Sequence, residues 1–173
     1  RAYQRMGNHD EAEREYRHAQ LKLADDESDP HHAEILVGLG RIALIKDHDV
    51  EQALEMFSAA AGRFPATRSY GEALIGLADC EARRGAHVRA CEVMREAVKY
   101  FAGELARPAD QIKALVETTL AHHQLQLDAN RPELAMDYLS VLNGLYGVDL
   151  PADIVLRFAA THDRIATDRS EDR

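Results

Sequence analysis

The sequence predicts an all-α protein, a right-handed α-solenoid built from antiparallel helical hairpins. Its 173 residues are rich in alanine, leucine, glutamate and arginine, and no segment alternates β-branched residues as a strand does. One pattern occurs four times: a small residue, a bulky apolar residue four positions later, and a small or apolar residue three further on. Because positions i, i+4 and i+7 share one helix face, this recurrence predicts stacked helices that each present one stripe to a neighbour.

The four occurrences are spaced like a structural repeat. Their first alanines are separated by 41, 37 and 45 residues, and their members are Ala12, Tyr16 and Ala19; Ala53, Phe57 and Ala60; Ala90, Met94 and Ala97; and Ala135, Leu139 and Leu142. Two related segments, 37–49 and 75–86, lie upstream of the second and third occurrences. When Gly38 is aligned with Gly76, Gly40 corresponds to Ala78. Small residues there allow two antiparallel helices to approach closely, so the unit is a helical hairpin.

Eight helices are expected from the apolar periodicity and the turn residues. Prolines at 30, 108 and 151 suit the first turn of a helix. The acidic stretch ADDESDP (24–30) and the stretch GLYGVDLP (144–151) are the longer connectors. The expected helices are 9–24, 31–46, 50–63, 67–84, 87–103, 108–128, 131–144 and 151–167.

These residues resemble the tetratricopeptide repeat family, whose 34-residue unit is a helix-turn-helix. Residues 36–65 match best, with one extra turn residue, and residues 74–102 match next best although Met94 replaces the aromatic residue. The matching positions are Leu39, Gly40, Ala53, Phe57, Ala60 and Pro65, then Leu77, Ala78, Gly85, Ala90 and Ala97, and in the first partial unit Tyr3, Gly7, Ala12, Tyr16 and Ala19.

The domain organisation expected from this resemblance is one repeat domain over residues 1–150. It contains a partial repeat at 1–24 and repeats at about 31–65, 67–103 and 108–144, the last of which lacks the Leu-Gly pair. A capping helix at 151–167 and a polar tail at 168–173 follow. The chain opens without Met, and Tyr3 already occupies a late first-helix position, so a longer parent protein with an earlier half-repeat is expected.

Composition and motifs exclude several function classes. With 30 acidic and 21 basic residues the formal charge is −9, which argues against nucleic acid as a partner and favours a basic or apolar one. No apolar run approaches the roughly 20 residues of a membrane helix, so no membrane insertion is expected. HExxH, P-loop, GxSxG and GxGxxG motifs are all absent from the sequence. We therefore expect neither enzyme activity nor a cofactor.

The cysteines and histidines are expected to be structural. Cys80 and Cys91 lie symmetrically about a turn and a disulfide is conceivable, but the repeat family fills both positions with small or apolar core residues, which favours buried thiols. His87 and Cys91 at i, i+4 could begin a metal site with Cys80, yet no fourth ligand is evident, so no metal is expected. His123 shares the apolar face of its helix, which is typical of a hydrogen-bonded core or interface histidine rather than a ligand or a pH switch.

The resemblance implies that ligands bind the concave face formed by the first helices of the hairpins. The register of Gly40 and Ala78 places these candidate partner-binding residues there: Glu34, Val37, Arg41, Leu44, Ile45, Glu72, Ile75, Asp79, Arg83, Glu117, Gln124 and Asp128. The Lys and Asn residues with which family members hold chaperone C-terminal carboxylates do not occur at these positions, which disfavours a chaperone-tail receptor. A mildly acidic groove with apolar patches suits a helix or extended peptide that carries Lys or Arg among apolar anchors. The alternative is a solvated face without a ligand.

Two functions remain open at this point. The first is a protein-interaction scaffold that binds a peptide or helix of a partner protein on the concave surface. The second is a sensor or regulatory region of a larger signalling or transcriptional regulator. Self-association through the repeat ends, as a homo-oligomer, is a third possibility. Two unpatterned cysteines favour a reducing cytoplasm, and the alanine- and arginine-rich composition points to a bacterial source.

Overall fold

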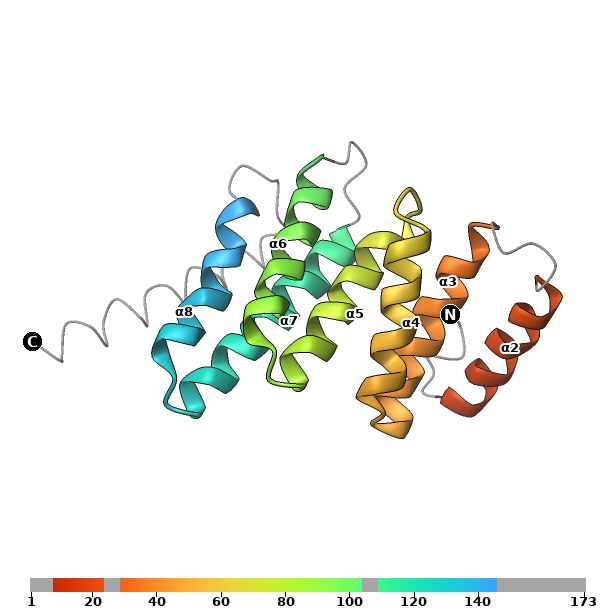
Figure 1. Cartoon of the computed structure of the whole chain (residues 1–173), viewed down its shortest axis with the longest axis horizontal. Coiled ribbons are helices and arrows are strands. Elements are labelled where there is room, and N and C mark those ends of the chain that lie inside the picture. The colour runs from red at the N-terminus through yellow and green to blue at the C-terminus, as the bar shows by residue number, and fades with distance from the viewer. Residues whose placement is uncertain (1–7, 24–28, 104–108, 146–173) are drawn as a thin grey trace, which may run out of the picture.

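The described part of the chain is a row of helices (Figure 1). The computed structural model describes residues 8–23, 29–103 and 109–145, and these contain helices but no strand. The α-helices are α2 (His9–Lys22), α3 (His31–Ile42), α4 (Val50–Arg63), α5 (Ser69–Arg83), α6 (His87–Gly103), α7 (Ala109–Asp128) and α8 (Pro132–Val141). A π-helical turn, η1 (Ala43–Asp47), continues α3, and a 3-10 turn, η2 (Leu142–Leu145), continues α8.

The helices pair into hairpins that stack side by side. α3 packs on α4, α5 on α6 and α7 on α8, and neighbouring hairpins meet through α4 and α5 and through α5 and α7. In Figure 1, α4, α6 and α8 form a front layer, and α3, α5 and α7 form a second layer behind it. This arrangement confirms the predicted all-α fold of stacked helical hairpins.

The predicted helices agree with the observed ones to within a few residues over the described ranges. The expected capping helix at 151–167 and the tail at 168–173 lie outside the described residues, and so does the connector 24–28. The boundaries of the repeats as units stay a prediction.

Each hairpin turn contains one residue in the left-handed region. His48 has φ 51°, Gly85 has φ 81° and Asn130 has φ 57°. At Gly85 the chain closes the helix with a reverse hydrogen bond, in which the Ala86 N–H donates to the Glu81 carbonyl at 2.9 Å. Glycine and asparagine tolerate this backbone conformation better than most residues, so the local sequence favours a sharp reversal into the next helix.

The extra turn residue of the first full hairpin is accommodated in η1. Gly40 and Ala53 are one position further apart than the aligned pair Ala78 and Ala90. A π-turn closes five-residue hydrogen bonds and thereby accommodates one additional residue within a helix. The His48 N–H donates to the Ala43 carbonyl across this turn, so the insertion leaves the register of α4 against α3 intact.

Aromatic rings lie against glycines where the helices meet. The ring of Phe57, on α4, lies against Gly40 of α3 and Gly76 of α5, where an added Cβ would fall 3.0 Å and 2.5 Å from ring atoms. Tyr16, on α2, lies in the same way against Gly38 of α3. A larger residue at Gly76 would push α5 away from α4. These contacts explain why glycine recurs at the aligned positions 38 and 76.

The helix faces that carry the repeated small and apolar residues form the core. The first alanine of each repeated pattern is buried, as are Phe57, Met94 and Leu139 at the bulky position. Both cysteine thiols are free and buried, and burial raises the pKa of Cys80 to about 12 and that of Cys91 to about 11. His123 is buried, and its Nδ1 lies 2.8 Å from the Ala135 carbonyl oxygen. The predictions of core thiols and of a hydrogen-bonded core histidine are therefore confirmed.

Candidate partner-binding surface

The first helices of the three hairpins, α3, α5 and α7, carry all the predicted partner-binding residues except Leu44 and Ile45, which lie in η1. The members at least partly exposed are Glu34, Arg41, Ile45, Asp79, Arg83, Glu117, Gln124 and Asp128. The buried members are Val37, Leu44, Glu72 and Ile75. These four are not available to a partner in the structure. Val37 and Leu44 belong to the same apolar cluster as Ala73 and Cys80 of α5, because adjacent first helices pack closely enough to bury the sides that face each other.

A polar link joins α3, α5 and α7 through Glu72, whose exposed fraction is only 5%. Arg41 of α3 places Nη2 3.1 Å from Glu72 Oε2. Gln111 of α7 donates from Nε2 to Glu72 Oε1 at 3.0 Å and to the Arg68 carbonyl at 3.3 Å. The buried carboxylate is thus paired from both neighbouring helices, and it holds the layer together.

A second polar link joins α5 to α7 through Asp79. His122 of α7 places Nε2 2.8 Å from Asp79 Oδ1, and Arg83 donates from Nε to Asp79 Oδ2 at 3.0 Å. Burial by itself raises the pKa of the Asp79 carboxyl, but the His122 hydrogen bond and the Arg83 guanidinium outweigh it and hold that pKa below its usual value. Asp79 is therefore ionised at neutral pH and fully engaged within the protein.

The second link continues from α7 into α8 and α6. The His122 ring stacks on Tyr138 of α8, with centroids 5.5 Å apart, and the Tyr138 hydroxyl lies 2.8 Å from Nδ1 of His87 on α6. Tyr138 is fully buried, and burial raises the pKa of its phenol. Burial also lowers the pKa of His87, with smaller contributions from Arg131 and His122. This network ties four helices together.

The lowered pKa of His87 predicts loss of stability in mild acid. A histidine whose folded-state pKa lies below its unfolded value of about 6.5 contributes stability that is fully present above that pH and is lost as the pH falls through the folded pKa. We expect the melting temperature to drop between pH 7.5 and pH 5.5, and to drop less in His87→Gln. The check is a series of thermal melts followed by circular dichroism. His18→Gln, at an exposed position on α2, should behave like wild type, and an identical pH profile for His87→Gln would contradict the assignment.

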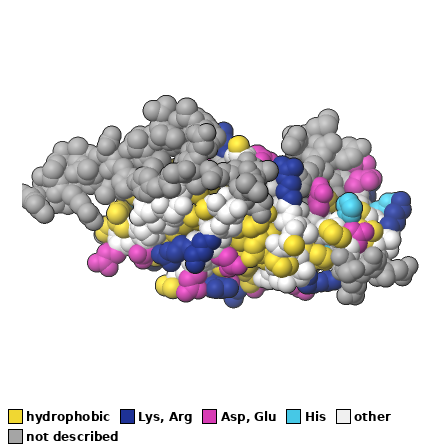
Figure 2. Space-filling model, turned by 90° about the horizontal axis from the view of Figure 1, so that it is seen from above, with side chains coloured by type: hydrophobic (Ala, Val, Ile, Leu, Met, Phe, Trp, Pro, Cys, Tyr) yellow, Lys and Arg dark blue, Asp and Glu magenta, His cyan; other side chains and the backbone are white. Residues whose placement is uncertain are grey.

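The predicted acidity of the groove is reduced by these links. Glu72 is buried and paired with Arg41, and the partly exposed Asp79 is paired with Arg83 and His122. The other predicted acidic members, Glu34, Glu117 and Asp128, are at least partly exposed, and Asp128 accepts a hydrogen bond from Gln124. On the face seen in Figure 2, acidic, basic and hydrophobic side chains are intermixed over the described residues that are visible. Sequence analysis missed Gln111 and His122 as partners of these carboxylates. Both lie on the buried face of α7, and a polar residue on an apolar stripe is the signal that marks them.

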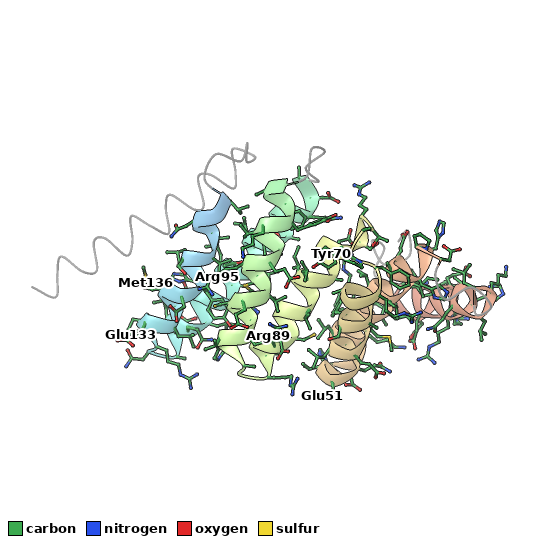
Figure 3. All side chains as sticks on the ribbon, turned by 45° about the horizontal axis from the view of Figure 1, so that its top comes forward. Glu51, Tyr70, Arg89, Arg95, Glu133 and Met136 are labelled. Atoms are coloured by element: carbon green, nitrogen blue, oxygen red, sulfur yellow. The ribbon has the colours of Figure 1, made fainter. Side chains whose placement is uncertain are left out.

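The other layer presents a different surface. Figure 3 looks onto it, and the labelled side chains that extend from its helices are Glu51 of α4, Arg89 and Arg95 of α6, and Glu133 and Met136 of α8. Arg89 pairs with Glu92 at 3.1 Å on the same helix, and Glu51 pairs with Arg84 at 3.1 Å. Pairs this exposed contribute little to stability. This layer supplies control positions for mutagenesis.

Two further properties bear on function. Over residues 8–23, 29–103 and 109–145, no three His, Cys, Asp or Glu side chains are grouped so that they could hold a metal ion. None of the helices in these ranges is long and apolar enough to cross a membrane. The histidine in the sequence-level metal hypothesis, His87, is instead hydrogen-bonded to Tyr138.

Comparison with known proteins supports the resemblance seen in the sequence. A search of curated proteins found no match. Residues 43–106, which run from η1 through α6, match the model of the tetratricopeptide repeat family. Members of this family are generally protein-protein interaction modules and typically not catalytic. This match supports an assignment to the tetratricopeptide repeat family.

Proposed function

We propose that this chain is a protein-interaction scaffold that binds a peptide or a helix of a partner protein across α3, α5 and α7. The observation that carries the proposal is the pair of buried links through Glu72 and Asp79. They connect three helices from different hairpins in one layer, and the partly exposed Arg41 and Arg83 take part in them. A surface ordered before binding loses less conformational entropy when a partner docks.

The partner chemistry follows from the side chains that stay exposed on this surface. Of the predicted residues that are at least partly exposed, four are acidic, Glu34, Asp79, Glu117 and Asp128, and two are basic, Arg41 and Arg83. Ile45 offers an apolar contact because 57% of it is exposed. A segment with Lys or Arg among apolar anchors therefore suits the surface, and the charged contacts would raise the rate and specificity of association more than its strength.

The test compares two triple variants that change the charge equally. Glu34→Lys, Glu117→Lys and Asp128→Lys alter the proposed surface, while Glu55→Lys, Glu92→Lys and Glu133→Lys alter exposed positions of α4, α6 and α8. Affinity capture from a lysate of the source organism, with the proteins identified by mass spectrometry, should yield a partner that wild type and the second variant retain. The first variant should lose it.

Glu72 and Asp79 are left unchanged in both variants, because a lysine at either position would break a link inside the protein and unfold the surface under test. Far-ultraviolet circular dichroism should give equal helicity for all three proteins. Retention of the partner should also weaken as salt rises. The proposal fails if both triple variants capture the same proteins as wild type.

A further inference from the structure

Two large apolar side chains are exposed on the layer formed by the first helices of the hairpins. Over the part of the chain that the structure describes, four large apolar side chains are largely exposed, and two of these, Leu21 and Val88, belong to α2 and α6. The other two are Ile45 in η1 and Leu125 on α7, and 57% of each is exposed. Single exposed apolar residues are common on protein surfaces, so the relative positions of Ile45 and Leu125 decide whether they act together.

Both side chains lie beside α5, one on each side of it. Ile45 follows Arg41 by four residues, and Arg41 pairs with a carboxylate of α5. Leu125 follows His122 by three residues, and His122 contacts another carboxylate of α5. Residues three or four apart lie on the same side of a helix. Ile45 and Leu125 are therefore on the sides of their helices that face α5, and they approach it from opposite directions.

Arg83 of α5 lies between them, next to the hairpin turns. It is aligned with Ile45 when the two repeats are superimposed in sequence, and it follows by four residues the carboxylate that His122 contacts. Ile45 lies in η1, Arg83 ends α5 and Leu125 lies in the last turn of α7. The turns that follow these elements lie along the lower edge of the molecule in Figure 1. We call Ile45, Arg83 and Leu125 the turn-end row.

The turn before this row is polar, and its side chains pair within the protein. Arg41, Asp79 and His122 occupy it and form the links described above. The exposed apolar surface is therefore limited to one helical turn, a rise of about 5.4 Å. A partner helix, about 10 Å in diameter, would also cover the polar turn. An extended segment occupies only about 4.8 Å, the spacing between neighbouring strands, and fits the row better.

We propose that the turn-end row binds one extended segment of a partner protein, through two apolar side chains that contact Ile45 and Leu125. This inference rests on the proposed function, because it uses the same layer of first helices. Packed helices are about 8–10 Å apart, so two contacts on either side of α5 are at most about 20 Å apart. Side chains on one face of an extended segment recur every second residue, at about 3.3 Å per residue. The two apolar residues of the partner therefore lie four or six positions apart.

Charged groups beside the row add to the recognition. Asp128 follows Leu125 by three residues, and it accepts a hydrogen bond from the Gln124 amide at 2.7 Å, a neutral group that does not balance its charge. A Lys or Arg next to the apolar residue at Leu125 therefore pairs with Asp128. In the middle of the row, Arg83 donates from Nε to Asp79, and its other N–H groups face a backbone carbonyl of the segment. The recognised sequence is an apolar residue, three or five others, and an apolar residue beside a basic one.

The test is a selection of random peptides, each about twelve residues long and displayed on phage, against the whole chain. Enriched peptides should share two apolar residues four or six positions apart, with Lys or Arg beside one of them. A fluorescein-labelled synthetic copy of the most enriched peptide is then titrated with the protein by fluorescence anisotropy. Ile45→Ser and Leu125→Ser should each weaken binding about tenfold, which corresponds to about 1.4 kcal/mol. Val88→Ser, which removes an exposed apolar side chain from α6, should leave binding unchanged.

Each other outcome overturns the proposal. Enriched peptides without the shared spacing, or with the spacing of an amphipathic helix, would exclude an extended segment. Equal binding by wild type, Ile45→Ser and Leu125→Ser would place the peptide elsewhere, and an equal loss in Val88→Ser would mean that the protein binds apolar peptides without a defined site. Sedimentation that shows a dimer, which Leu125→Ser dissociates, would assign the row to a second copy of this chain. Equal melting temperatures of the four proteins ensure that differences in binding are not due to unfolding.

Failure of this inference is distinguishable from failure of the proposed function. A lysate partner that the first triple variant loses, but that Ile45→Ser and Leu125→Ser retain, would keep the proposed function and overturn the role of the turn-end row. A lysate partner that both triple variants retain would overturn the proposed function itself.

Discussion

Replacing Phe57 with alanine is expected to lower the free energy of unfolding by about 3–5 kcal/mol, the range for deleting a fully buried phenylalanine side chain. The Phe57 ring is 1% exposed and contacts two hairpins at once, through Gly40 of α3 and Gly76 of α5. Its loss leaves a cavity that two glycines cannot fill. Urea unfolding followed by circular dichroism at 222 nm measures the change.

Two controls distinguish this contact from a general loss of apolar surface. Phe57→Leu keeps most of the volume and should cost less than Phe57→Ala. Tyr16→Ala removes the equivalent residue on α2, where the ring is only partly buried, and should therefore also cost less. If Tyr16→Ala destabilises the protein as much as Phe57→Ala does, Phe57 is not the residue that joins the two hairpins.

Replacing Asp79 with alanine is expected to cost about 1–3 kcal/mol, because it leaves the largely buried His122 without its acceptor and Arg83 without its partner. The cost should depend on pH. A carboxyl whose folded-state pKa is depressed stabilises the protein above its unfolded pKa of about 3.9, and this contribution is lost as the pH falls through the folded value. The difference between wild type and variant should therefore be constant near neutrality and shrink below about pH 4.

Chemical denaturation at several pH values tests this expectation. Asp137→Ala is the matched control, because Asp137 is an exposed aspartate on α8, and its loss should change stability by no more than about 0.5 kcal/mol. If Asp79→Ala behaves like the control at pH 7, the link between α5 and α7 contributes nothing measurable. The contact between α5 and α7 would then depend on apolar packing and on the hydrogen bond from Gln111 to Glu72.

The links through Glu72 and Asp79 also change how the candidate surface is understood. From the repeat register alone, both carboxylates are assigned to a partner. In the structure they bind Arg41 and Gln111, and Arg83 and His122. Their hydrogen-bonding partners lie 39 and 43 residues away in the sequence. Contacts over that distance leave no periodic signal, so the sequence places both residues on first helices but does not reveal what they bind.

By itself, the sequence determined the helical class, the hairpin unit and nearly all helix boundaries over the described residues. The reason is that these depend on local terms: helix propensity, the spacing of apolar residues, and turn residues such as Gly85 and Asn130. It also identified the buried cysteines and His123, because burial follows from position on an apolar face.

Only the tertiary structure decided which residues of the first helices are buried and which polar groups pair within the protein. Val37, Leu44 and Ile75 share the outward register with Arg41 and Arg83, yet they are buried, because the distance between adjacent first helices determines how much of each stripe is covered. Likewise, Tyr16 and Phe57 occupy the same place in the repeat. Phe57 is packed between α3 and α5, whereas Tyr16 is only partly buried, because exposure depends on neighbours that no local pattern encodes.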